Sequence, residues 1–509
     1  MCGILLILGD LKRATTDEQR AACLAALRAR GPEYAAIAEH FGALMGFTRL
    51  AINGLSARGN QPILVAGDEK RGGSALVCNG EIYNHAALAA ALKTDSGVEV
   101  DAESGDCAVL PHLLATLPPT EACRAIDGVF ALARVGAASG TTLVARDPYG
   151  VRPLYWGRSR GTDGVAFASE IKALLPICSH IEPFPPGKWW RVDTHSGLTL
   201  ESGRYHETPW LKVPLFDDEV LAAGALSDAL IKAVEKRLMS DRPVGALLSG
   251  GLDSSLVCAI AAHALSARGK RLTTFTVGMA GSTDLAYARK VATHIKSEHH
   301  EVLLTPADFF AAIPAVIAAA GTYDVTSVRA TVGNYLVAKH IREHTDVKVV
   351  LNGDGSDEVG GGYLYFGRAP SDAAFEAECD RLLADIHYFD VLRSDRGVAA
   401  HGLEARTPFL DKQLVNTWRA ISTRLRRHTA MQPEKSILRR AFAEEGLLPD
   451  EVLWRTKEAF SDGVSAVETP WHASIDAWAR SFLTERGVIL GTHFAHNTPR
   501  TRSAQGASA

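Results

Sequence analysis

The chain has 509 residues, enough for two or three domains with a sizeable core. Hydrophobic residues make up 47% and charged residues 22%, as in ordinary globular proteins, and the formal net charge is only −4. This charge argues against general binding to nucleic acid or anionic membranes. The longest apolar stretch, Phe309–Ala320, contains Pro314 and is too short to span a bilayer, so no membrane association is expected.

The first residues and the cysteines favour a cytoplasmic protein. The start, MCGILLILGD, has no basic residue before its apolar run, so a secretory signal is not expected. The eight cysteines form no C-x-x-C pair and have no regular spacing. In a chain of this length, that pattern is typical of reduced thiols, and it predicts neither a disulfide framework nor a zinc site.

Residues 1–205 contain short β-type runs separated by turn signals, with helical stretches at Thr16–Ala29 and His85–Leu92. The runs are Leu5–Leu8, Ala75–Cys78, Val129–Val135, Thr141–Val144 and Val165–Ala168. This pattern predicts an α+β domain built on stacked antiparallel sheets. Residues 206–219 follow with two prolines and no clear period, which predicts a linker.

From residue 220 to about 490, strand-like runs alternate with helical ones. The runs are Val244–Leu248, Leu272–Val277, His300–Leu304 and Val347–Leu351. This rhythm predicts an α/β domain with a parallel sheet and a ligand crevice at the C-terminal strand ends. The chain reads mainly helical after about residue 370. Residues 491–509 end in a small, polar segment and are expected to be disordered.

One segment of the second half predicts an anion site. The run Val244–Leu248 reads as a buried strand, Ser249–Ser255 reads SGGLDSS, and a helical pattern follows to Ala267. Backbone N–H groups and the helix dipole then face a bound anion, and the glycines allow close approach. A glycine-rich turn alone is usually only a turn, but this complete string resembles the PP-loop of the ATP pyrophosphatases. Those enzymes hold the pyrophosphate of ATP and release AMP.

Cys2 directly follows the initiator methionine. Removal of Met1 would leave a thiol and a free α-amine on one residue, so that the amine can act as base for the thiol. A cysteine at position 2 alone is often incidental, but other motifs follow it in order. Together they resemble the class II glutamine amidotransferases, which use an N-terminal cysteine nucleophile. The motifs are Arg30-Gly31-Pro32, Arg49-Leu50-Ala51-Ile52, Gln61-Pro62, Asn79-Gly80-Glu81-Ile82-Tyr83-Asn84 and Ser104-Gly105-Asp106.

This resemblance implies a role for each residue of a glutamine site. Arg49 would pair with the carboxylate of glutamine, and Asp106 and Glu81 would pair with its ammonium. The Asn79 amide and the Gly80 N–H would stabilise the oxyanion of thioester formation. Leu50 and Ile52 belong to the same site in the family. Taken singly, these residues also fit a surface arginine, a capping aspartate and a hairpin turn.

Both families occur together in glutamine-hydrolysing asparagine synthetases, which the chain resembles over nearly its whole length. Further matching strings are Arg146-Asp147-Pro148-Tyr149-Gly150, Ala168–Ala173, Thr322–Val325, Gly353–Glu358, Gly402–Asp411 and Trp454–Glu458. The resemblance implies that Leu248 and Val277 hold the adenine and ribose end of ATP, beside Asn352 and Gly353. The pyrophosphate would lie on Ser249, Gly250, Gly251, Asp253, Ser254 and Ser255.

The implied reaction needs aspartate, glutamine, ATP and Mg²⁺. Asp253 and Asp357 would be the magnesium carboxylates, although Asp253 also fits a helix N-cap. Aspartate would attack the α-phosphorus, while Arg329 and Lys457 neutralise the leaving pyrophosphate, with Lys435 assisting. Ammonia freed at Cys2 would then travel inside the protein to the adenylate. A solvated loop lysine is the other interpretation of Lys457.

The sequence departs from the family pattern in two places. The family's S-G-E-G-S-D-E reads Asn352-Gly353-Asp354-Gly355-Ser356-Asp357-Glu358 here. Asp354 is one methylene shorter than the family's glutamate but keeps the carboxylate that would polarise the attacking amine. The C-terminal segment also ends early, which bears on domain docking and on a homodimer that the sequence leaves open.

Two other functions remain open at this point. One is a related amidotransferase that acts on a different carboxylic acid in specialised metabolism. Its β-lactam synthetase branch lacks the cysteine nucleophile, so Cys2 and Arg329 argue against that branch. The other is a non-catalytic relative that binds a nucleotide, supported only by Asp354 and the shortened tail.

Overall fold

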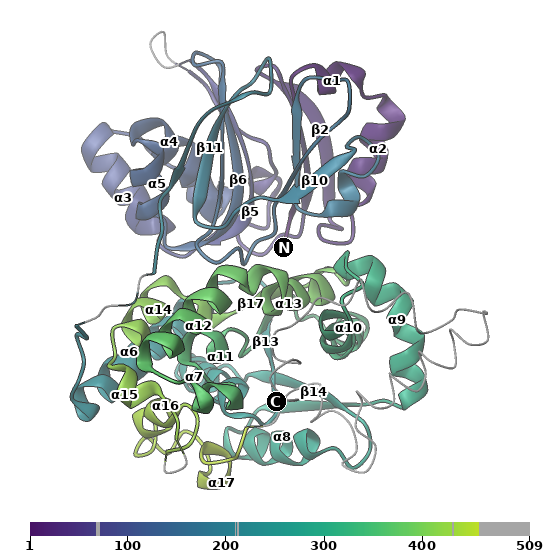
Figure 1. Ribbon diagram of the computed structural model, residues 1–509. Coiled ribbons are helices and arrows are strands. Elements are labelled where there is room, and N and C mark those ends of the chain that lie inside the picture. The colour runs from purple at the N-terminus through teal and green to yellow at the C-terminus, as the bar shows by residue number, and fades with distance from the viewer. Residues whose placement is uncertain (68–71, 209, 211–212, 430–431, 458–509) are drawn as a thin grey trace.

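A computed structural model describes residues 1–67, 72–208, 210, 213–429 and 432–457. The two halves of the chain form two bodies, the N-terminal one above the C-terminal one in Figure 1. The expected tail at 491–509 and the end of the expected second domain, from residue 458 on, lie outside the described residues.

The N-terminal half confirms the expected α+β class. Its elements are β1 (Gly3–Leu8), α1 (Asp10–Ala14), α2 (Asp17–Ala25), β2 (Tyr34–His40), β3 (Ala43–Arg49), β4 (Ile63–Val65), β5 (Ser74–Ile82), α3 (His85–Ser96), α4 (Leu110–Thr116), α5 (Pro119–Ala125), β6 (Gly128–Gly136), β7 (Thr141–Arg146), β8 (Tyr155–Arg158), β9 (Val165–Ala168), β10 (His180–Pro183), β11 (Lys188–Asp193) and β12 (Thr199–Arg204). They build two six-stranded antiparallel sheets, in the orders β10-β8-β9-β1-β3-β2 and β12-β11-β7-β6-β5-β4.

Each of these sheets is covered on both faces. In β1, Ile4 and Leu6 join an apolar cluster with residues of the other sheet, whereas Leu5 and Ile7 pack against the helical side with Leu11. The order of layers is therefore helix, sheet, sheet, helix. Because both faces are buried, β1 reads as a continuous apolar run without the alternation of a half-exposed strand.

The C-terminal half contains the expected parallel sheet. Its elements are α6 (Glu219–Lys236), β13 (Val244–Leu247), α7 (Leu252–Ser266), β14 (Thr273–Gly278), α8 (Thr283–His294), β15 (Glu298–Leu303), α9 (Pro306–Ala320), α10 (Val325–His344), β16 (Val349–Leu351), α11 (Ser356–Gly360), α12 (Asp372–Asp385), α13 (Asp390–Ala399), β17 (Glu404–Arg406), α14 (Lys412–Arg419), α15 (Thr423–Arg426), α16 (Ser436–Ala441) and α17 (Asp450–Leu453). The strand order is β15-β14-β13-β16-β17, with every neighbouring pair parallel.

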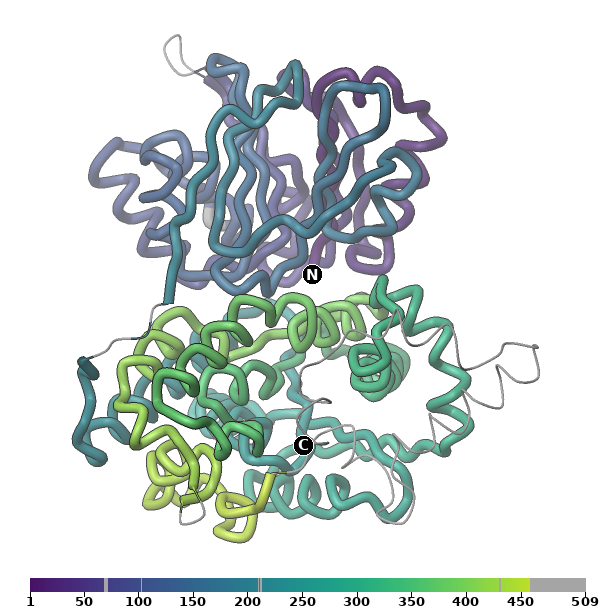
Figure 2. The backbone as a smooth tube through the Cα atoms, viewed as in Figure 1, coloured from purple at the N-terminus to yellow at the C-terminus, as the bar shows by residue number. Residues whose placement is uncertain are grey.

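Strand β17 was not expected from the sequence. Its three residues include two charged ones, Glu404 and Arg406, and both are buried. The other four strands lie where the apolar runs predicted them, with ends that differ by one or two residues. The expected linker, 206–219, overlaps the stretch between β12 and α6, and Figure 2 shows the chain leaving the upper body at one side after β12.

The apolar stretch Phe309–Ala320 lies in α9. Its Phe309, Ile313 and Val316 are buried in a core cluster with residues of α10. Within the described part of the chain, no single helix combines the length and hydropathy needed to cross a membrane. Helices α9 and α10 reach that level only as a pair, by length and composition, and a bend of 106° separates them.

Buried ion pairs join the two halves. Arg30 donates through Nη1 to Asp395 Oδ1 (2.6 Å) and through Nη2 to Asp395 Oδ2 (3.0 Å). Arg152 lies 3.3 Å from Glu404, joining the upper body to β17. All four side chains are at least 95% buried, so losing a partner across the junction would leave a buried charge less well compensated.

A second buried charge cluster holds the helical part together and allows a stability test. Glu376 in α12 accepts from Arg419 (2.5 Å), Thr423 (2.6 Å) and Arg426, and it is 1% exposed. Among the described residues, Glu376→Gln leaves the buried guanidinium of Arg426 without a counter-charge and leaves Arg419 with Asp380 alone. We expect a loss of about 3–5 kcal/mol in unfolding free energy, seen as a lower calorimetric midpoint.

The matched control is Glu378→Gln on the same helix. Glu378 pairs with Arg381 at the surface, where such pairs contribute about 0–1 kcal/mol. Equal midpoints for the two variants would contradict a structural role for the Glu376 cluster.

Candidate active sites

Cys2 lies at the lower end of the first sheet, immediately before β1. Its backbone N–H donates to Asn79 Oδ1 (3.0 Å), and its carbonyl oxygen accepts from Arg30 Nε (2.9 Å). The thiol faces the carbonyl oxygen of Leu50, 3.8 Å away. Loss of hydration raises the pKa of the thiol to about 11, against the opposing effect of the nearby N-terminal amine. The thiol therefore needs a base before it can act as a nucleophile.

The Asn79 side chain is oriented by this contact. Its Oδ1 is engaged by Cys2, so the amide nitrogen Nδ2 points elsewhere. Nδ2 is buried and has no hydrogen-bond partner in the described part of the chain. A buried donor without a partner costs free energy unless a ligand accepts from it. Gly80 follows directly on β5, where it lies opposite Phe130 of β6.

Arg49, at the end of β3, and the residues that follow it belong to the predicted glutamine site. Arg49 donates to Ser56 O (2.7 Å), Asn60 Oδ1 (2.9 Å) and Gly54 O, which fixes its guanidinium group. Leu50 and Ile52 follow it, and both are buried.

The two predicted ammonium partners differ in their surroundings. Asp106 is buried and accepts from the N–H of Ile82 (2.7 Å), and loss of hydration raises its pKa. Glu81 is already paired, because it accepts from Asn53 (2.6 Å) and lies 3.1 Å from Arg406 of the lower half. These contacts favour Asp106 as the partner of an ammonium ligand.

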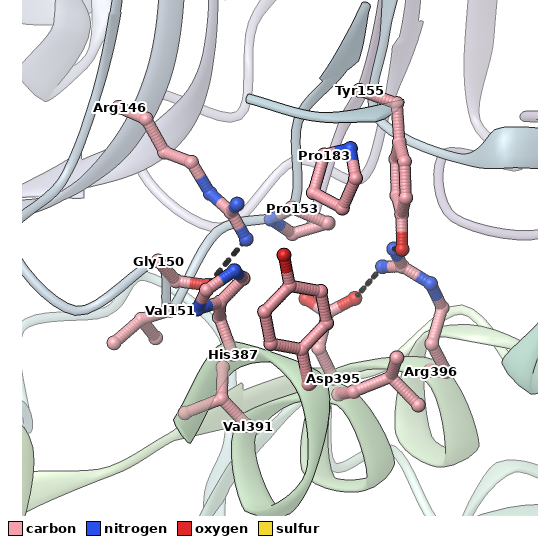
Figure 3. A pocket seen from close by; sticks show the side chains of 12 residues that line it. Arg146, Gly150, Val151, Pro153, Tyr155, Pro183, His387, Val391, Asp395 and Arg396 are labelled. Atoms are coloured by element: carbon pink, nitrogen blue, oxygen red, sulfur yellow. Dashed lines mark hydrogen bonds and ion pairs between the residues drawn. The ribbon is translucent and has the colours of Figure 1, made fainter. Parts of the chain in front are cut away.

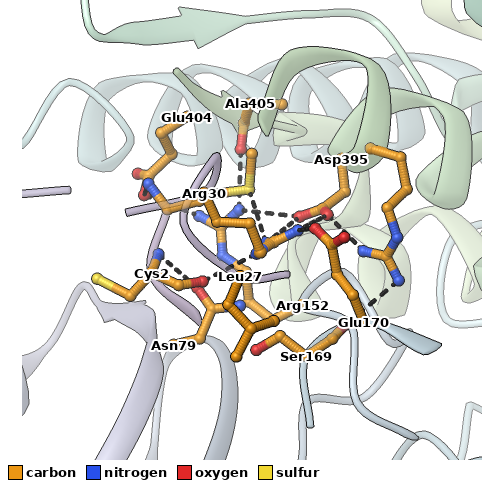
Figure 4. A network of polar contacts seen from close by, with 12 residues as sticks. Cys2, Leu27, Arg30, Asn79, Arg152, Ser169, Glu170, Asp395, Glu404 and Ala405 are labelled. Carbon is orange, nitrogen blue, oxygen red and sulfur yellow. Dashed lines mark hydrogen bonds and ion pairs between the residues drawn. The ribbon is translucent and has the colours of Figure 1, made fainter. Parts of the chain in front are cut away.

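Met1 is buried next to Glu404 of β17. Its terminal ammonium lies 3.3 Å from Glu404 Oε2, and Figure 4 shows Glu404, Arg30 and Asp395 gathered around the start of the chain. Glu404 also pairs with Arg152 and Arg406, and these cations hold its pKa below the usual range. Glu404 is thus a charged carboxylate beside the ammonium of Met1.

The PP-loop follows β13 as the sequence predicted. Gly250 has φ +76°, and a Cβ there would meet the Ala288 nitrogen at 2.5 Å, so this position requires glycine. The hydroxyls of Ser249 and Ser254 are 2.9 Å apart across the turn. Helix α7 begins at Leu252, so Asp253, Ser254 and Ser255 form its first turn.

The neighbouring strands close around this loop. Leu248 donates to Phe275 O of β14 (2.8 Å), and Val277 is buried farther along the same strand. After β16, Gly353 lies so close to the loop that an added Cβ would be 2.7 Å from the Ser254 nitrogen. Asn352 is also buried. The predicted nucleotide residues therefore meet at the C-terminal edge of the sheet.

Two lysines lie between the predicted magnesium carboxylates. Lys435 Nζ contacts both Asp253 Oδ2 (2.5 Å) and Asp357 Oδ1 (2.6 Å), and Lys457 Nζ contacts Asp357 Oδ2 (2.5 Å). The lysines hold the pKa of Asp357 well below its usual range. Because one ammonium touches both carboxylates, the two aspartates face a common position.

That donor set fits Mg²⁺ only with help from the substrate. In the described residues, no group of three or more His, Cys, Asp or Glu side chains could hold a metal ion. Mg²⁺ commonly binds one or two carboxylates together with phosphate oxygens. Asp253 and Asp357 fit this arrangement if ATP supplies the remaining oxygens.

Arg329 and Asp354 lie on different elements. Arg329 is in α10, and its buried Nε has no hydrogen-bond partner among the described residues. Asp354 follows β16 and accepts from Asn352 Nδ2 (2.9 Å). Loss of hydration raises the pKa of Asp354, although Arg393, 3.6 Å away, opposes this effect.

A cavity between the two halves is too small for a substrate. It measures about 10 Å³, roughly the space of one water molecule, and Figure 3 shows Arg146, Tyr155, His387 and Arg396 around it. Arg146 donates to three carbonyl oxygens, at 2.7–2.9 Å. This cavity therefore lies apart from the predicted substrate residues at Cys2 and at the PP-loop.

Comparison with known proteins finds two family models, one for each half of the chain. Residues 1–185 match the family model described as "Glutamine amidotransferase domain", and residues 225–380 and 368–499 match "Asparagine synthase". Proteins named "Asparagine synthetase [glutamine-hydrolyzing]" from Cricetulus griseus and Homo sapiens are 37% and 36% identical over 530 residues, covering 99% of this chain and 91% of theirs. The protein of that name from Triphysaria versicolor is 38% identical over 518 residues, covering 99% of this chain and 84% of its own.

The chain belongs to the glutamine-hydrolysing asparagine synthetase family. For a member of this family, the structure adds contacts that the motifs did not reveal. Glu404 and Asp395 reach the Cys2 region from the lower half, and Lys435 bridges two aspartates. Glu404 lies inside the matching string Gly402–Asp411, whereas Asp395 lies in none of the matching strings, so no motif indicated its contact.

The contact between Gly353 and the PP-loop gives a direct test. Gly353→Ala places a methyl group 2.7 Å from the Ser254 nitrogen, which must displace the loop. We expect at least a tenfold loss of ATP affinity, measured by titration calorimetry. Gly224→Ala in α6 is the control, since nothing lies within 4 Å of its added Cβ. ATP affinity equal to wild type in Gly353→Ala would contradict this packing.

Proposed function

We infer that this protein is a glutamine-dependent asparagine synthetase, an enzyme that uses ATP and forms AMP. The observation that carries the inference is one chain that holds both sites and matches both family models. Cys2 and a PP-loop on a parallel sheet occur in a sequence that matches enzymes of that name over 99% of its length.

The proposed first step is glutamine hydrolysis at Cys2. After removal of Met1, the α-amine takes the thiol proton, and the thiolate attacks the side-chain amide carbon of glutamine. The unpartnered Nδ2 of Asn79 and the Gly80 N–H stabilise the oxyanion. Arg49 pairs with the substrate carboxylate and Asp106 with its ammonium. The α-ammonium returns this proton to the leaving nitrogen, ammonia departs, and water then releases glutamate from the thioester.

The second step activates aspartate. Its β-carboxylate oxygen attacks the α-phosphorus of ATP, the bond to the β-phosphate breaks, and pyrophosphate departs. Loop Ser249–Ser255 holds the pyrophosphate, while Arg329 and Lys457 offset its charge. Mg²⁺ on Asp253 and Asp357 would supply further charge neutralisation. Lys435 contacts both carboxylates and so helps to set their positions.

The third step forms the amide. Ammonia attacks the β-carbonyl carbon of the aspartyl-adenylate, the carbon–oxygen bond to AMP breaks, and one proton leaves the nitrogen. We assign Asp354 as the carboxylate that polarises ammonia and takes this proton. Its raised pKa, caused by loss of hydration, suits a proton acceptor better than an ordinary exposed aspartate.

The domain limits and cellular context are part of the same proposal. We assign residues 1–205 to the glutaminase domain, 206–219 to the linker and 220–490 to the synthetase domain. A cytoplasmic location agrees with eight free thiols. We also propose a homodimer, which light scattering would test.

The deciding experiment is a product assay. With aspartate, glutamine, ATP and Mg²⁺, we expect asparagine, glutamate, AMP and pyrophosphate in equal amounts, and no pyrophosphate when Mg²⁺ is chelated. Cys2→Ala should stop glutamine use while ammonium salts still support synthesis, because the thiol acts only on glutamine.

Other carboxylic acids form the comparison arm of this assay. Pyrophosphate release with a different acid, and none with aspartate, would identify a related amidotransferase. A folded protein that binds ATP but releases pyrophosphate with no acid would be the non-catalytic relative.

Asn79 gives a sharper test of the glutaminase site. Asn79→Ala removes the free amide donor, and we expect the rate constant for glutamine hydrolysis to fall about 10²–10³-fold. Ammonia-supported synthesis by the same sample reports whether the protein is folded. An unchanged rate of glutamine hydrolysis would exclude Asn79 as an oxyanion donor.

A further inference from the structure

The two residues that depart from the family string after β16 contact each other. Where the family has serine and glutamate, this chain has Asn352 and Asp354. The Asn352 Nδ2 donates to Asp354 Oδ2 (2.9 Å), and the Asp354 N–H lies 3.4 Å from Asn352 Oδ1. Asn352, which is longer than the family's serine, thus contacts Asp354, which is shorter than the family's glutamate.

The backbone at Asn352 and Gly353 is fixed, so it cannot move to make up for the shorter side chain of Asp354. Asn352 donates its N–H to Arg406 O of β17 (3.1 Å), so its main chain continues the pairing of the sheet. Gly353 is packed against the PP-loop. With both fixed, an aspartate carboxylate ends one carbon–carbon bond, about 1.5 Å, short of a glutamate carboxylate.

The surroundings hold the asparagine firmly. Its Nδ2 also donates to Ser394 Oγ (2.5 Å) of α13, and both side chains are at most 3% exposed. On the other side of Asp354, Oδ1 lies 3.6 Å from Arg393, which Asp390 holds at 2.7 Å. A serine hydroxyl at position 352 is too short to make the bridge from Ser394 to Asp354.

We propose that Asn352 is the positioning residue for Asp354, and that the two exchanges compensate each other in amide formation. The proposal rests on the proposed function, because Asp354 is the carboxylate assigned to the attacking ammonia. The Asn352 amide holds one carboxylate oxygen and fixes the side-chain rotamer. The other oxygen, 3.6 Å from Arg393, takes the proton that ammonia loses as the bond to AMP breaks.

The test is a double-mutant cycle with ammonium as nitrogen donor. Asn352→Ser removes the amide that joins Ser394 to Asp354, and Asp354→Glu adds a methylene beside that amide. Each variant should therefore lower kcat/KM for ammonia at least tenfold. Each should also lower the ratio of asparagine to pyrophosphate, because an adenylate that waits for ammonia is lost to water. The double variant restores the family's pair and should return both quantities to within about threefold of wild type.

Two controls separate this role from a merely structural one. Asn416→Ser on α14 and Asp372→Glu on α12 make the same exchanges at exposed positions and should not change the ratio. Thermal midpoints of all variants show whether losses follow unfolding. Asp354→Asn keeps the shape but not the charge, and no change at position 352 should rescue it.

The outcomes distinguish the two levels of inference. Losses that multiply in the double variant, or an Asn352→Ser enzyme within twofold of wild type, overturn the pairing alone. A wild-type protein that releases pyrophosphate with aspartate but forms no asparagine overturns the proposed function and the pairing with it. Recovery in the double variant supports the pairing.

Discussion

The ion pair between Arg30 and Asp395 is the contact on which both sites depend. Removing two charges from water costs several kcal/mol per ion, and only good geometry with further hydrogen bonds offsets it. Arg30 meets this condition with two bonds to Asp395, one to Glu170 and one to the Cys2 carbonyl oxygen. Arg30, together with Arg396 and Arg152, holds the pKa of Asp395 at about 2, so the ion pair between Arg30 and Asp395 stays charged. The nucleophile's backbone is thereby attached to the opposite half.

Helix α13 connects the two reaction centres through neighbouring residues. Asp395 engages Arg30 beneath Cys2, and Ser394 accepts from Asn352 beside the PP-loop. One turn earlier, Asp390 holds Arg393 near Asp354. A rigid helix that contacts both sites keeps their separation constant, which suits a reaction in which ammonia must pass from one to the other. The contacts are local and polar, whereas the helix itself is held by buried packing.

The sequence was most informative where chemistry and local structure coincide. The PP-loop was predictable because a strand, a glycine turn and a helix start occur within a few dozen residues. Strand β17 was not, because Glu404 and Arg406 look like surface residues until Arg152 and Glu81, far away in the chain, are placed against them. The pairing of Glu81 likewise depends on a contact that no local pattern contains. Residue spacing and hydropathy do not reveal which charged residues are buried against partners far away in the chain.

The buried charges at the junction also limit how such a protein can evolve. The face of the lower half that carries Asp395, Glu404 and Arg406 is complementary to the arginines and carboxylates of one specific upper half. Recombination with a different glutaminase would remove Arg30 from Asp395 and Arg152 from Glu404, and these buried carboxylates would keep only Arg396 and Arg406 as counter-ions in the described part of the chain. The two catalytic units are therefore not interchangeable modules. A glutaminase half from another protein would need arginines and carboxylates at the same positions of this junction to replace the one present here.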